Sequence, residues 1–109
     1  LKIEHACRVS KVDQIRHLIA SHTKPWRRCS NEERLDPENG FLLTPTVAHL
    51  FDKGFISFEN NGDVIVSPVA HNESLAKMGV AARAGLNVGS FTEGQKKYLD
   101  WHRDSLLLS

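Results

Sequence analysis

The sequence predicts a small α+β domain, in which two short strands and a helix are followed by a β-hairpin and a C-terminal helix. An Asn-Gly pair opens a short apolar run at 41–43, and a Thr-Pro pair then begins a helix that ends at Gly54. A second Asn-Gly pair, at 61–62, separates two β-rich runs, which is the strongest short signal for a hairpin. The 109 residues have room for a single domain, residues 1–109, with a modest core.

The expected elements follow from local signals along the chain. Apolar residues at helical spacing after Asp13 favour a short helix before the first strand. Ser30 and Glu33 form a capping-box pattern inside a long polar loop. Tyr98 and Leu99 lie on the apolar face of an amphipathic C-terminal segment. The expected elements are strands at 18–21 and 41–43, a helical turn at 31–34, a helix at 45–53, a hairpin at 55–67, a short helix at 72–77 and a helix at about 92–107.

Composition and charge exclude several classes of protein. The formal net charge is only +1, and no apolar run approaches the length of about 18 residues that would cross a bilayer. Cys7 and Cys29 form no CxxC pair, so we expect free thiols in a reducing cytoplasm and no structural zinc. The sequence begins at Leu1 without a signal-peptide pattern, which favours a fragment of a longer protein.

Three motifs in a fixed order carry a family resemblance: ASHTKPW at 20–26, ERLDPENG at 33–40 and LFDKG at 50–54. Together they resemble the HNH endonucleases, in particular the restriction-type HNH domains. The resemblance implies a ββα-metal finger (His-Me finger) over about 18–54. It also implies hydrolysis of phosphodiester bonds in double-stranded DNA with a divalent metal ion, most often Mg²⁺ or Mn²⁺.

Site residues are carried over by their position in these motifs. The resemblance implies that His22 is the general base and that Asn39, at the turn into the second strand, holds the loop that orients His22. Metal ligands in this family project from the helix and from the residue before the base, which here are Asp52, Ala48 and Ser21.

The helix departs from the family pattern at one ligand position. Family members place a ligand nine residues after the motif Asn, where this chain has Ala48, which cannot coordinate a metal. His49 lies about 100° around the helix and does not replace it. Ser21 is a weak ligand because its hydroxyl is neutral, so Asp52 is the one anionic ligand expected. Either position 48 was substituted to inactivate the protein, or the site is naturally weakened.

The loop after His22 carries the expected DNA contacts. Lys24, Arg27 and Arg28 lie together there, and we expect them to bind phosphates. We expect Trp26, in the same loop, to pack on the core.

Two other functions compete with the nuclease. A noncatalytic DNA-binding or interaction module with a degenerate site is favoured by Ala48, and a toxin nuclease is a weaker alternative because such toxins share the finger. A nuclease with one site would need a homodimer to cut both strands. The sequence gives neither the target sequence nor any preference for modified bases.

Overall fold

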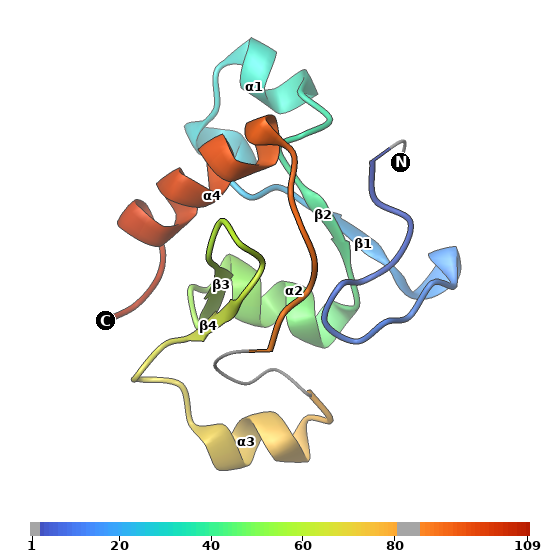
Figure 1. Ribbon diagram of the computed structural model, residues 1–109, viewed down its shortest axis with the longest axis vertical. Helices are drawn as coiled ribbons and strands as arrows, with labels where there is room; N and C mark the ends of the chain where they lie inside the picture. Colours follow the sequence, from blue (N-terminus) through green and yellow to red (C-terminus); the bar gives the residue numbers. More distant parts are fainter. Residues whose placement is uncertain (1–2, 81–85) are drawn as a thin grey trace.

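The structure is a computed structural model that describes residues 3–80 and 86–109 (Figure 1). Within these residues the chain forms two antiparallel two-stranded sheets and four α-helices, so the α+β prediction is confirmed. In chain order the elements are η1 (Ile15–His17), β1 (Ile19–Ser21), η2 (Trp26–Arg28), α1 (Asn31–Leu35), β2 (Phe41–Leu43), α2 (Pro45–Asp52), β3 (Ile56–Phe58), β4 (Val64–Val66), α3 (Asn72–Lys77) and α4 (Glu93–Ser105).

The first sheet and α2 form the unit that positions the site. β1 pairs with β2 so that Ser21 lies opposite Phe41, and α2 packs against both strands. Pro45 occupies the first turn of α2, where its missing N–H is not needed. The helix ends before Gly54, whose φ of +80° is the left-handed conformation that glycine adopts readily. A Cβ at position 54 would collide with the carbonyl of Leu106, so this turn is also closed by the C-terminal segment.

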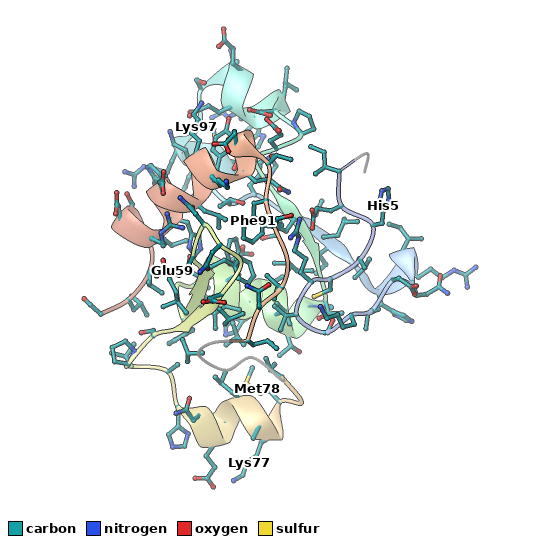
Figure 2. The ribbon with its side chains drawn as sticks, viewed as in Figure 1. His5, Glu59, Lys77, Met78, Phe91 and Lys97 are labelled. Carbon is teal, nitrogen blue, oxygen red and sulfur yellow. The ribbon has the colours of Figure 1, made fainter. Side chains whose placement is uncertain are left out.

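An aromatic cluster joins the two sheets into one core. The ring of Phe41 lies edge-on to Phe51, Phe58 and Phe91, with centroids 5.6 to 5.9 Å apart. These rings come from β2, α2, β3 and the segment before α4, and Figure 2 shows Phe91 in the middle of the molecule. Edge-to-face pairs at this separation add to the stabilisation from burial. The sheet that carries β1 is thereby fixed relative to the hairpin.

The C-terminal helix packs across β3 and the end of α2. A capping box between Thr92 and Gln95 begins α4, and the buried ring of His102 contacts Ser57 of β3 and the carbonyl of Phe51 in α2. Beyond the helix, the N–H of Leu108 donates to the carbonyl of Gly54 at 2.9 Å. The C-terminal segment therefore lies against the end of α2, next to Asp52.

The helix expected before β1 is wrong. This region contains only the 3₁₀ turn η1, in which Ile15 is 62% exposed. Pairing with β2 extends the chain from Ile19, so the apolar residues at helical spacing cannot share one helix face. None of the helices in the described residues is long and apolar enough to cross a membrane.

Candidate functional site

A groove of about 470 Å³ opens where β1 and α2 end. It is lined by Ala20, Ser21, His22, Pro25, Trp26, Arg27, Asp52 and Leu106. A second hollow, of about 310 Å³, shares Ala20, Ser21 and His22 with the groove and adds residues of α1 and the start of β2. The His22 side chain thus borders two concave surfaces and is half-buried between them.

A short hydrogen bond joins the two elements that form the groove. Ser21 is the last residue of β1, Asp52 is the last residue of α2, and the Ser21 hydroxyl donates to Asp52 Oδ1 at 2.5 Å. Ser21 is buried, whereas Asp52 is exposed. The hydroxyl therefore fixes the orientation of a carboxylate that solvent and ligands can reach.

His22 is oriented by a backbone carbonyl of α1. Its Nε2 lies 3.4 Å from the carbonyl oxygen of Arg34. Because that oxygen can only accept, this contact favours the neutral tautomer in which Nε2 carries the proton and Nδ1 has a free lone pair. The ring therefore retains one nitrogen that can accept a proton.

Asn39 ties the loop after His22 to α1. Its Oδ1 accepts from the N–H of Lys24 at 2.8 Å, and its Nδ2 lies 3.3 Å from each of three acceptors, the Lys24 carbonyl, Cys29 Sγ and the Glu33 carbonyl. The side chain is almost fully buried. A buried amide with this many partners is costly to remove, because each partner would lose its hydrogen bond.

Gly40 and Asp36 support this arrangement, and we did not identify either from the sequence. A Cβ at Gly40 would lie 2.8 Å from the Ser21 carbonyl oxygen, so only glycine lets β2 begin this close to the end of β1. Asp36 accepts hydrogen bonds from the Tyr98 hydroxyl at 2.7 Å and from the Glu38 N–H at 2.9 Å. Burial, and then the hydrogen bond to Asp36, raise the pKa of Tyr98. The one available signal was the position of both residues inside ERLDPENG.

Ala48 lies on a different face from the groove. Its side chain is buried in the hydrophobic core and lines neither of the two concave surfaces around His22. His49, the next residue, is exposed and lines a separate hollow with Phe55 and Met78. The structure therefore brings together Ser21, His22 and Asp52 but places neither Ala48 nor His49 in the same groove.

The three basic residues expected to bind DNA have different surroundings. The Lys24 ammonium lies 3.0 Å from both carboxylate oxygens of Glu33, and hydrogen bonds from Ser30 and Lys24 lower the pKa of Glu33. Arg27 is exposed and lines the groove, and Arg28 is exposed near the ring of Trp101. Neither arginine has an ion-pair partner within residues 3–80 and 86–109.

Trp26 does not pack on the core as expected. It is 56% exposed at the edge of the groove, in the 3₁₀ turn η2. Pro25 fixes the extended backbone before this turn, and the guanidinium of Arg34 covers the indole ring at 3.8 Å from its centroid. The ring is thus held at the surface by a cation–π contact instead of by burial.

The donor atoms in the groove fit a divalent metal ion only in part. No group of three or more His, Cys, Asp or Glu side chains that could hold a metal occurs in the described part of the chain. The groove offers the Asp52 carboxylate and the Ser21 hydroxyl. Mg²⁺ is often held by one or two carboxylates while substrate phosphates and waters supply the other oxygens. These residues therefore fit such an ion when a phosphate completes its coordination.

A family model described as HNH endonuclease matches residues 7–59, which contain β1, α1, β2, α2 and β3. No curated protein matches the chain.

Proposed function

We propose that this chain is the DNA-cleaving domain of a restriction-type enzyme with His22 as its general base, because the HNH endonuclease model matches residues 7–59. HNH endonucleases act on DNA and generally use a divalent metal ion. The observation that carries the proposal is the groove that His22 lines together with Asp52, whose carboxylate Ser21 orients. In this proposal the β1–β2–α2 unit is the ββα-metal core.

His22 would remove a proton from the water that attacks the phosphorus. Hydrolysis of a phosphodiester needs such a base, and positioned general bases contribute about 10²- to 10⁴-fold to the rate. The contact of Nε2 with the Arg34 carbonyl leaves Nδ1 free for the proton. Asn39 would be a positioning residue, because its hydrogen bonds hold the backbone two residues after His22.

Asp52, with help from Ser21, would hold the metal ion, which when bound stabilises the negative charge that develops on the phosphate and the leaving oxygen. A single carboxylate holds a divalent ion weakly on its own. We therefore propose that the protein with Ala48 cleaves slowly. Arg27, at the edge of the groove, would bind a neighbouring phosphate.

One observation favours a second candidate, a noncatalytic DNA-binding module. Position 48, where the family resemblance implies a ligand, is an alanine in the core, so the groove holds one anionic donor, Asp52. Such a module would bind DNA through the same basic loop and cleave nothing.

Nicking of supercoiled plasmid across a titration of Mg²⁺ and Mn²⁺ separates the two candidates. The nuclease predicts metal-dependent nicking that His22→Ala lowers at least about 100-fold, with little change in DNA affinity. His5→Ala is the control variant, since His5 is an exposed histidine that does not line the groove (Figure 2). Binding without nicking at any metal concentration would support the module. Linear product that rises more steeply with protein concentration than nicked product would support cleavage by a homodimer.

A further inference from the structure

We propose that Trp26 is a stacking platform for one nucleobase beside the phosphate held in the groove. The preferred substrate would then be DNA with an unpaired or easily unstacked nucleotide at that point. This inference rests on the proposed function, because it places DNA in the groove that Trp26 shares with His22 and Asp52.

The exposure of Trp26 is the first observation. Large aromatic side chains are mostly buried in folded proteins, whereas 56% of this residue is accessible. It lies at the edge of a groove that also contains a basic side chain, Arg27. A large exposed aromatic residue next to an exposed arginine in a groove indicates a ligand that has both a flat apolar face and a negative charge. A nucleotide has both.

The rigidity of the ring is the second observation. The Arg34 guanidinium covers the indole at 3.8 Å from its centroid, and Arg34 Nε also donates to the carbonyl oxygen of Trp26 at 2.9 Å. Arg34 thus holds both the side chain and the backbone of Trp26. Since one face of the indole is covered while more than half of the residue stays exposed, the other face is available to a ligand.

Arg34 also fixes the position of Trp26 relative to the candidate base. The carbonyl of the same residue whose side chain covers Trp26 lies 3.4 Å from Nε2 of His22. Arg34, a single residue of the short helix α1, therefore contacts both the candidate base and the aromatic platform. A base stacked on Trp26 would hold its own phosphate at a fixed place relative to His22.

The preference for unpaired DNA follows from the cost of exposing a base. In an intact duplex each base is stacked between its neighbours, and extracting one costs free energy, least at mismatched or unpaired positions. Stacking on an aromatic side chain tolerates any base, because every base has a flat π face. Trp26 would therefore select for local DNA structure and only weakly for sequence.

Binding without metal tests this inference independently of cleavage. Fluorescence anisotropy in EDTA would compare an intact duplex with the same duplex carrying one unpaired nucleotide. We expect the wild-type protein to bind the second DNA about tenfold more tightly, and Trp26→Ala to lose about that factor on the second DNA alone, as removal of a stacked aromatic does. Trp26→Phe should keep most of the preference. Ile15→Ala, which removes an exposed apolar side chain outside the groove, should change neither affinity.

A spectroscopic measurement locates the contact. In a Trp101→Phe background, where Trp26 is the remaining tryptophan, DNA with an unpaired nucleotide should quench the protein fluorescence more than intact duplex does. Circular dichroism of each variant would confirm that it folds.

The outcomes distinguish this inference from the proposed function. A Trp26→Ala variant that binds both DNAs as wild type does, or loses the same factor on both, overturns the stacking role. A binding preference for unpaired nucleotides that depends on Trp26, in a protein that never nicks plasmid, overturns the nuclease and leaves the stacking inference standing. Nicking that depends on His22, in a protein that shows no preference for unpaired nucleotides, overturns the stacking inference and leaves the nuclease standing. Absence of binding to either DNA overturns both.

Discussion

Acidification should destabilise the fold at His102, which lies where α4 crosses β3 and the end of α2. The ring is fully buried, with Nδ1 at 2.8 Å from the Ser57 hydroxyl and Nε2 at 2.8 Å from the Phe51 carbonyl oxygen. It also stacks on the Phe51 ring, with centroids 4.0 Å apart. Burial lowers the pKa of His102 from 6.5 to about 4, while the hydrogen bond to the Phe51 carbonyl opposes this effect and the charge of Arg103 adds to it.

The magnitude follows from the difference between the folded and unfolded pKa values. Between pH 6.5 and about 4, the unfolded chain binds a proton at this position that the folded chain does not. The stabilising effect of the neutral ring is therefore complete above pH 6.5 and is lost as the pH falls toward 4. At about 1.4 kcal/mol per pH unit, this group lowers the free energy of unfolding by about 3 kcal/mol across that range.

Urea unfolding followed by circular dichroism between pH 7.5 and 4 would measure this loss. The comparison variant is His102→Gln, whose amide offers one donor and one acceptor but does not titrate. Because the carboxylates titrate in both proteins, the difference between the two pH profiles isolates His102. We expect wild type to lose about 3 kcal/mol more than the variant. Parallel profiles would refute the reasoning, since they would mean that His102 has the same pKa in both states.

Three further predictions concern the groove. Asn39→Ala should lower the free energy of unfolding by about 2 kcal/mol and also slow nicking. A destabilised but folded variant that nicks plasmid as fast as the wild-type protein would refute the positioning role. Ala48→Asp should lower the melting temperature measured without metal, because it buries a carboxylate in the core. If position 48 is a ligand site, Mn²⁺ should restore the melting temperature of this variant and raise its nicking at least about tenfold over the protein with Ala48. Arg27→Ala should weaken DNA binding and its salt dependence more than Lys24→Ala, because Lys24 is paired with Glu33; equal effects in anisotropy titrations would contradict this.

Local signals in the sequence determined most of the secondary structure. The predicted strand at 41–43 is β2, and the predicted helix at 45–53 differs from α2 by one residue. The hairpin and the turn of α1 also lie where the Asn-Gly pair and the capping box placed them. These signals are reliable because caps and turns are satisfied by neighbours within about four residues. The three motifs likewise indicated the HNH endonuclease family, which the match over residues 7–59 supports.

The apolar spacing before β1 was a weaker signal. It predicted a helix, but pairing with β2 extends the chain from Ile19 onward, and the region before Ile19 contains only the 3₁₀ turn η1. A periodic pattern without a clear cap is easily overridden by tertiary contacts.

Tertiary structure alone decided how the site is assembled. The hydrogen bond from Ser21 to Asp52 joins residues 31 positions apart, and the four contacts of Asn39 depend on where α1 lies. Likewise, the sequence placed Trp26 in the core and Ala48 beside Asp52, whereas the fold exposes the first and buries the second. Spacing along the chain defines which face of an element a side chain occupies, but the packing of elements distant in sequence decides what that face meets.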